Sequence, residues 1–188
     1  MATEDIAEAV EDDTAERRLR LLRQAYLGQA GSGSISQTRS RPSRPSHSSP
    51  PVNLGLVDHV RRCVTEVEAY TRAAVPDAGP VPSEAESVYS WSREVTSHLA
   101  PQRQQAREAV IYRQGLEHAV AMGQHEVVRP HPCPACGCWG LYWNTRRQKA
   151  VCVNRRCVDE HGRGRAWPLE RLASEYMTRQ KMLKDQAT

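Results

Sequence analysis

Five of the six cysteines of the chain lie in one segment of its last third, which reads Cys133-Pro-Ala-Cys136-Gly-Cys138-Trp-Gly-Leu-Tyr-Trp-Asn-Thr-Arg-Arg-Gln-Lys-Ala-Val-Cys152-Val-Asn-Arg-Arg-Cys157. Two cysteine pairs, with two and four residues between their members, flank a run of fifteen residues. Each short pair turns tightly, so that its two thiolates face one ion, and this is the spacing of a four-cysteine zinc site. The sequence therefore predicts one Zn²⁺ ion held by Cys133, Cys136, Cys152 and Cys157.

The residues between the two pairs predict a β-hairpin that carries the second pair back to the first. Residues 141–143 and 150–153 are the expected strands, and the polar residues 145–149 form the turn between them. Gly137 follows the first pair, where a tight turn needs a residue that tolerates a positive φ angle. A small zinc ribbon is therefore the expected fold of this part of the chain.

Three further residues compete for the metal. Cys138 is a fifth cysteine of the stretch, but its spacing from Cys136 is less suited to chelating one tetrahedral ion, so we place Cys138 outside the ligand set. His131 and His161 flank the cluster. Replacement of one of the four ligands by Cys138 or by a flanking histidine remains open at this point.

A closed site of four thiolates leaves no coordination position for water, so the predicted zinc is structural. The chain has no Gly-rich phosphate loop, no H-E-x-x-H sequence and no G-x-S-x-G sequence. We therefore expect a protein that is not an enzyme and has no small-molecule substrate.

The composition of the 188-residue chain argues against a large hydrophobic core. Phe is absent and hydrophobic residues make up 39%, so part of the chain is expected to be disordered. No apolar run approaches the ~18 residues of a membrane span, and the N-terminus lacks the basic and apolar regions of a secretory signal. We expect a cytoplasmic location without membrane contact, where clustered cysteines are metal ligands more often than disulfides.

Sequence patterns divide the chain into three parts. Residues 1–53 predict an acidic arm, partly helical between residues 15 and 27, and a disordered linker rich in Ser, Pro and Arg. Residues 54–124 predict a helical hairpin or three-helix module, because apolar residues recur at intervals of three and four. Residues 125–188 predict the zinc ribbon and a C-terminal helix that opens at Pro168. The expected fold class is mainly α with a small β zinc ribbon.

The helical module holds one cysteine and several histidines. Cys63 is expected to be a buried apolar side chain, because no second cysteine lies near it in the sequence. His98, His118 and His125 are expected to be exposed or to cap helices, in preference to forming a second metal site.

Charge is distributed unevenly along the chain. Residues 125–188 contain 12 Lys and Arg against 6 Asp and Glu, whereas residues 1–124 contain 14 against 16. Positive charge beside an aromatic side chain suits a surface that contacts phosphates and stacks on unpaired bases. The residues predicted to bind nucleic acid are Trp143, Arg146, Arg147, Lys149, Arg155 and Arg156. For Trp143 the alternative is a place in the small core of the zinc ribbon.

Three segments together carry a resemblance: residues 133–141, residues 152–157 and residues 167–173, which read Trp-Pro-Leu-Glu-Arg-Leu-Ala. They resemble zinc-ribbon proteins of actinobacteria, their phages and their mobile elements, over about residues 128–178. The resemblance implies a small accessory or regulatory protein that acts on nucleic acid, DNA above all. The four-residue gap in the second cysteine pair departs from the common two-residue gap.

A second hypothesis is a protein–protein interaction adaptor, such as a phage structural or host-takeover protein. In that case the zinc ribbon and the helices are scaffolding, and the acidic arm or an apolar helix face binds a protein partner.

Overall fold

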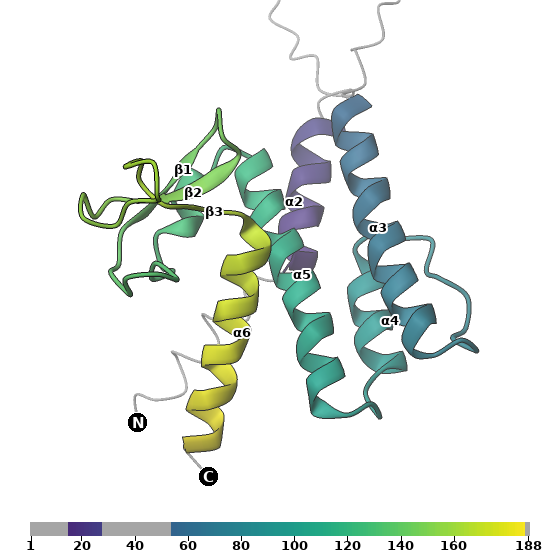
Figure 1. The fold of residues 1–188 in the computed structure, drawn as a ribbon. Coiled ribbons are helices and arrows are strands. Elements are labelled where there is room, and N and C mark those ends of the chain that lie inside the picture. The colour runs from purple at the N-terminus through teal and green to yellow at the C-terminus, as the bar shows by residue number, and fades with distance from the viewer. Residues whose placement is uncertain (1–14, 28–53, 187–188) are drawn as a thin grey trace, which may run out of the picture.

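The computed structural model of the chain describes residues 15–27 and 54–186, and this part is mainly helical with one small sheet (Figure 1). Its elements in chain order are α2 (Ala15–Leu27), α3 (Leu54–Ala74), α4 (Ser87–Val95), α5 (Pro101–Ala121), the 3₁₀ helix η2 (His125–Val128), β1 (Leu141–Asn144), β2 (Lys149–Cys152), β3 (Ala166–Trp167) and α6 (Leu169–Gln186). Within the described ranges, no helix has the length and apolar character that a membrane crossing requires.

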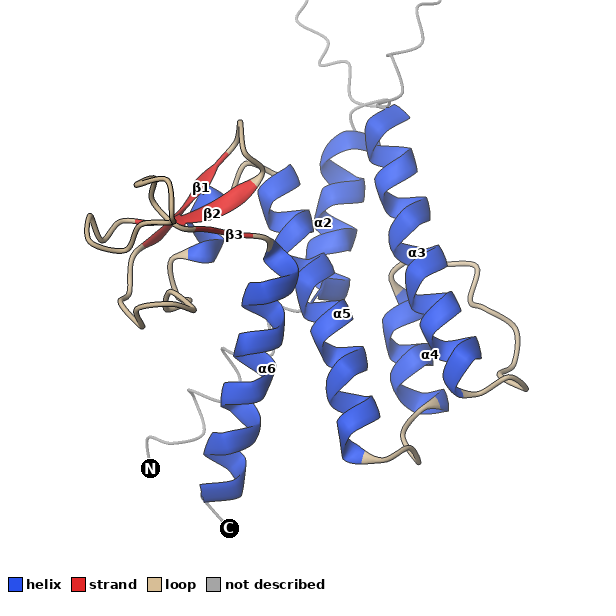
Figure 2. Ribbon diagram, viewed as in Figure 1, coloured by secondary structure: helices blue, strands red, loops and turns tan. Residues whose placement is uncertain are grey.

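Helix α5 is the central element of the helical part. Figure 2 shows α6 along one side of α5 and α2, α3 and α4 on the other side. Val67 of α3, Val88 and Tyr89 of α4, and Ile111 of α5 share one core cluster, and each is at most 2% exposed. The apolar residues that recur at intervals of three and four therefore form the buried faces of packed helices, as the sequence predicted.

Helix α2 belongs to the same core, although the sequence placed residues 1–53 outside it. Leu19 and Leu22 are completely buried. Helix α2 comes close to α5 at Gly115, where an added Cβ would lie 3.3 Å from Cβ of Ala15. The helix expected between residues 15 and 27 is therefore confirmed, but it packs in the core and does not form a separate arm. The remainder of residues 1–53 lies outside the described residues.

The sheet has three antiparallel strands in the order β1-β2-β3. The β1–β2 hairpin is the predicted one, with Leu141 opposite Cys152 and Trp143 opposite Ala150. Strand β3, which pairs with β2, was not predicted because it is only two residues long. Side chains alternate between the two faces of a strand, so Leu141 and Trp143 point toward the helices while Tyr142 points outward.

We call residues 129–168, which hold the sheet and the cysteines, the cysteine lobe. A second core cluster joins this lobe to the helices, because it contains Leu141 and Cys152 of the lobe together with Leu116 of α5 and Leu172 of α6. The predicted boundary between residues 124 and 125 therefore does not separate two independently packed units. The lobe lies at the end of α5, and α6 runs back from it along α5 (Figure 1).

Candidate metal centre

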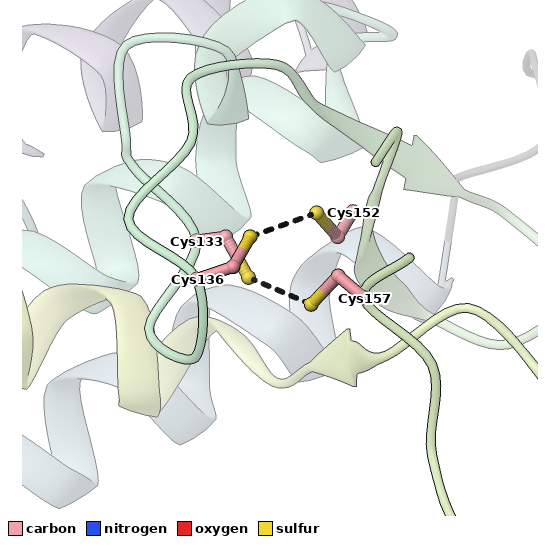
Figure 3. A group of neighbouring side chains, drawn as sticks. All are labelled: Cys133, Cys136, Cys152 and Cys157. Carbon is pink, nitrogen blue, oxygen red and sulfur yellow. Dashed lines mark hydrogen bonds between the residues drawn. The ribbon is translucent and has the colours of Figure 1, made fainter. Parts of the chain in front are cut away.

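The four cysteines predicted to bind zinc come together in the cysteine lobe (Figure 3). The sulfurs of Cys133, Cys136, Cys152 and Cys157 all lie within 4.8 Å of one another. Cys133 Sγ is 3.7 Å from Cys157 Sγ, and Cys136 Sγ is 3.7 Å from Cys152 Sγ. Four sulfurs about 2.3 Å from a tetrahedral ion are about 3.8 Å apart, so the arrangement fits one metal ion with four thiolate ligands.

The first cysteine pair is held by a compact turn. The Gly137 amide donates to the Cys133 carbonyl at 2.8 Å, and the Cys133 amide donates to the Cys138 carbonyl at 2.9 Å. Gly137 has a φ angle of +68°, as its position after the pair predicted. The turn places the sulfurs of Cys133 and Cys136 on the same side of the loop.

The second pair accommodates its four-residue gap with a turn at Asn154. The Asn154 carbonyl accepts from the Cys157 amide at 2.9 Å, and its side-chain oxygen accepts from the Arg156 amide at 3.0 Å. The Asn154 side-chain amide also donates a hydrogen bond to Cys136 Sγ, at 3.8 Å. The same residue therefore shapes the second turn and contacts a sulfur of the first pair.

The fifth cysteine lies at the edge of this cluster. Cys138 Sγ is 3.2 Å from Cys136 Sγ and 3.4 Å from Cys152 Sγ, but it is not one of the four sulfurs that lie within 4.8 Å of one another. Hydrogen bonds with the backbone and the side chain of Cys138 lower the pKa of the Cys136 thiol to about 6. Burial has the opposite effect on Cys157, whose pKa it raises to about 11.

Neither flanking histidine joins the four sulfurs. His131 is buried, its Nε2 lies 3.0 Å from the Tyr112 hydroxyl, and its Nδ1 lies 3.3 Å from the Val128 carbonyl. His161 is exposed beside Glu160. Of the three residues that the sequence left as possible replacements for one of the four ligands, only Cys138 therefore remains.

The predicted basic residues occupy two separate places on the lobe. Arg146 and Arg147 are exposed in the turn between β1 and β2, and Lys149 is exposed at the start of β2. Arg155 and Arg156 are exposed in the second cysteine turn, beyond the other end of β2. The four residues of β2 span about 13 Å, so the structure brings these five cations to two ends of one hairpin and not to a single cluster.

The prediction that Trp143 binds nucleic acid is wrong. Only 9% of Trp143 is exposed, and its ring belongs to the core cluster shared with Leu116 and Leu169. Its neighbour Tyr142 is 45% exposed. Strand alternation exposes only one of two consecutive aromatic residues, and it is Tyr142 that reaches the surface.

Sequence reasoning missed a second group of metal-ligating side chains. His59, Cys63 and His118 lie with one ligand atom each within 4.8 Å of one another, between α3 and α5. Cys63 is buried as predicted, but His118, expected at the surface, is completely buried. The i, i+4 spacing of His59 and Cys63 on one helix face was the available signal. His98 and His125 are exposed, as expected.

A scan against models of known protein families, a search of the curated proteins and a search of the solved structures each found no match to this chain. The resemblance of the cysteine stretch to zinc-ribbon proteins therefore stays a prediction. The structure itself shows a helical protein with a small sheet and four clustered cysteines that could hold a metal ion.

Proposed function

We propose that this chain is a nucleic-acid-binding protein, acting on DNA first of all, in which zinc held by the four cysteines is a scaffold for the cysteine lobe. The observation that carries the proposal is a set of exposed cations on the lobe that have no carboxylate partner among the described residues. The set consists of Arg146, Arg147, Lys149, Arg155 and Arg156.

Several arginines on the helices are instead paired with carboxylates. Arg93 pairs with Glu108 at 3.0 Å, Arg72 pairs with Glu68 at 2.8 Å, and Arg113 pairs with Glu66 and Glu117. A cation already paired with a carboxylate must give up that partner to contact a phosphate. The unpaired cations of the lobe meet a phosphate backbone without this loss, and they release its counterions on binding.

The turn between β1 and β2 is held in shape, which favours a preorganised contact. The Arg147 amide donates to Asn144 Oδ1 at 2.9 Å, and the Gln148 side-chain amide donates to the Thr145 carbonyl at 2.7 Å. Tyr142 lies on the outward face of the sheet, diagonal to Lys149 in the register of the hairpin. Tyr142 thereby supplies an exposed ring beside positive charge, on which an unpaired base would stack.

The salt dependence of binding tests this proposal. Each phosphate that the protein neutralises contributes about −0.9 to the slope of log affinity against log salt on duplex DNA. Three contacts from Arg146, Arg147 and Lys149 reduce affinity by roughly 40-fold between 50 and 200 mM salt. Replacing these three residues together by alanine should flatten the slope by up to about three units, with the zinc content unchanged.

The matched control removes the same charge elsewhere. Arg61, Arg103 and Lys181 are exposed and lie on the helices, so their triple alanine variant has the same net charge as the test variant. It should keep the wild-type slope. Equal slopes for the two triple variants, or no binding of DNA or RNA by the wild type at 50 mM salt, would refute the proposal.

Single strands test the stacking role of Tyr142. Base–aromatic stacking is worth about 1–3 kcal/mol per base, so Tyr142→Ala should weaken single-strand binding about 5- to 150-fold and leave duplex binding nearly unchanged. The residue is exposed, so this variant should fold normally.

A protein–protein adaptor is the second candidate, and a groove between the lobe and α6 favours it. The groove has a volume of about 190 Å³ and is lined by Trp139, Tyr176 and Leu183, among others. Trp139 is 66% exposed and Leu183 is 56% exposed. Trp139→Ala should abolish capture of a protein partner and leave the salt slope unchanged, whereas the triple alanine variant of Arg146, Arg147 and Lys149 should do the reverse.

The scaffold role excludes catalysis at the four cysteines, because four protein thiolates leave no position for water. Together with the resemblance to zinc-ribbon proteins, this leads us to propose an accessory or regulatory role on the DNA of an actinobacterium or actinophage.

A further inference from the structure

We propose that His59, Cys63 and His118 form a second metal site, separate from the four cysteines, which takes Zn²⁺ and leaves one coordination position open. His59 and Cys63 lie one turn apart on α3, and His118 faces them from α5. Two imidazoles and one thiolate are a ligand set that zinc prefers, and three protein ligands are the number found in zinc sites with an exchangeable position.

The distances are close to those of a metal site. His59 Nε2 lies 2.9 Å from His118 Nδ1, and Cys63 Sγ lies 3.8 Å from His59 Nε2. Around a tetrahedral zinc, two nitrogens are about 3.3 Å apart and a nitrogen and a sulfur about 3.6 Å apart. These two distances differ from those of a zinc site by only a few tenths of an ångström, and the ligand atoms of Cys63 and His118 lie within 4.8 Å of each other.

Hydrogen bonds hold His118 with its Nδ1 lone pair directed toward this position. The Gln114 amide donates to the Cys63 carbonyl and to Glu66, so its oxygen must accept from the Tyr89 hydroxyl at 2.9 Å. The Tyr89 oxygen must then accept from His118 Nε2, which lies 2.9 Å away and carries the proton. Nδ1 of His118 is left unprotonated, as a metal ligand must be.

A different contact opposes the metal. Arg62 Nη2 donates to His59 Nδ1 at 2.9 Å. An arginine only donates, so this contact keeps the His59 proton on Nε2, the atom that would bind zinc. When Zn²⁺ binds, Arg62 must move away, the His59 proton passes to Nδ1, and the Cys63 thiol releases its proton to solvent. Arg62 is exposed and can make this movement.

The proposed site adjoins a cavity through His59. His59 lines a cavity of about 330 Å³ together with Arg62, Glu117 and Trp143, where α3 and α5 meet the cysteine lobe. Cys63 and His118 are at most 1% exposed, whereas His59 is half-buried. A metal ion and a fourth ligand, either water or a small anion, therefore reach the site from the side of His59.

Metal stoichiometry tests the site in the full chain. Wild-type protein folded with excess Zn²⁺ and then dialysed should retain two equivalents, and Cys63→Ala and His59→Gln should each retain one. His125→Gln, which changes an exposed histidine, should retain two. The proposal is overturned if the folded wild type and folded Cys63→Ala bind the same amount of metal. The salt slope of nucleic-acid binding is a separate readout, so it distinguishes this outcome from failure of the proposed function.

Replacement of Arg62 tests the second site through an expected gain in metal affinity. Arg62→Met removes the opposing donor and should tighten the second equivalent by on the order of tenfold, the usual scale of an outer-shell contact. Arg61→Met, at the adjacent exposed position, should have no effect. Equal affinities in the two variants would contradict the role assigned to Arg62 and the ligand role of His59.

Cobalt tests the open position. Azide added to Co²⁺-loaded wild type should change the visible spectrum, because an anion can enter the fourth position. Azide should leave Co²⁺-loaded Cys63→Ala unchanged, since the four-cysteine site is closed. An identical response of the two proteins would show that no open position exists at His59, Cys63 and His118.

Discussion

At the scale of single residues, the metal centre depends on which four of five neighbouring cysteines bind the ion. Cys138 lies as close to Cys136 and Cys152 as a ligand would, yet it is outside the set of mutually close sulfurs. The backbone of the first turn is held by two hydrogen bonds, from the Cys133 amide to the Cys138 carbonyl and from the Gly137 amide to the Cys133 carbonyl. We attribute the difference to this turn, which is built around Cys133 and Cys136.

We therefore expect Cys152→Ser to lose the zinc of this site, because serine is a poor ligand for zinc and Cys152 is buried within the cluster. Cys138→Ser is the matched control and should retain the zinc. Metal analysis of the two purified variants measures both outcomes. Loss of zinc in Cys138→Ser with retention in Cys152→Ser would reverse the ligand assignment.

Prediction of single residues from the sequence succeeded where the chemistry depends on the spacing of neighbouring residues. It failed where the role of a residue depends on which side of a strand its side chain occupies. The cysteine spacing identified the four sulfurs that approach one another. The prediction of Trp143 as a surface residue failed, because the period of two in a strand says that Tyr142 and Trp143 face opposite sides but not which side meets the helices.

At the scale of elements, α2 should contribute to stability like any core helix. Leu19 is completely buried, so Leu19→Ala should lower the free energy of unfolding by about 2–5 kcal/mol. Leu21 is on the same helix but is 41% exposed, and Leu21→Ala should have little effect. Urea unfolding of the two variants compares them directly, and equal stabilities would show that α2 is not docked in solution.

The contact between α4 and α5 should depend on pH through Glu108. Burial raises the pKa of this carboxyl, but hydrogen bonds and charges from Arg93 and Arg107 outweigh burial and hold it below its usual value of 4.5. A lowered pKa in the folded state means that the stabilisation is present at neutral pH and is lost as the pH falls below about 4.5.

Glu108→Gln should therefore cost about 1–2 kcal/mol at pH 7, and its difference from the wild type should shrink as the pH falls below 4.5. Glu94→Gln, at an exposed position of α4, should match the wild type at both pH values. Urea unfolding at pH 7 and at acid pH gives the comparison. A gap that stays constant with pH would contradict the ionised pairing of Glu108.

At the scale of the whole molecule, the metal centre and the helices share one core. Cys133, Cys152 and Cys157 belong to the same cluster as Leu116 of α5 and Leu172 of α6. Repulsion or rearrangement of the cysteines after metal loss must therefore disturb the packing of the two long helices.

Chelation should lower the melting temperature of the helices as well as that of the lobe. Loss of several kcal/mol corresponds to about 10 °C for a chain of this length. Circular dichroism of Cys63→Ala protein, with and without a chelator, isolates the four-cysteine site from the second site proposed above. A helix melting temperature that does not respond to the chelator would mean that the lobe and the helices unfold independently.

Sequence patterns alone predict the cysteine cluster, the hairpin between its two pairs and the helices within residues 54–121, because ligand spacing, turn residues and apolar intervals act over a few neighbouring residues. The three-dimensional packing was needed to show that α2 packs on α5, that Trp143 faces inward, and that His118 lies beside His59 and Cys63. Each of these depends on which helix faces meet, and His59 and His118 are 59 positions apart. The local periodicity of apolar residues predicts that a helix has an apolar face. Which other helix that face contacts depends on the packing of the whole chain.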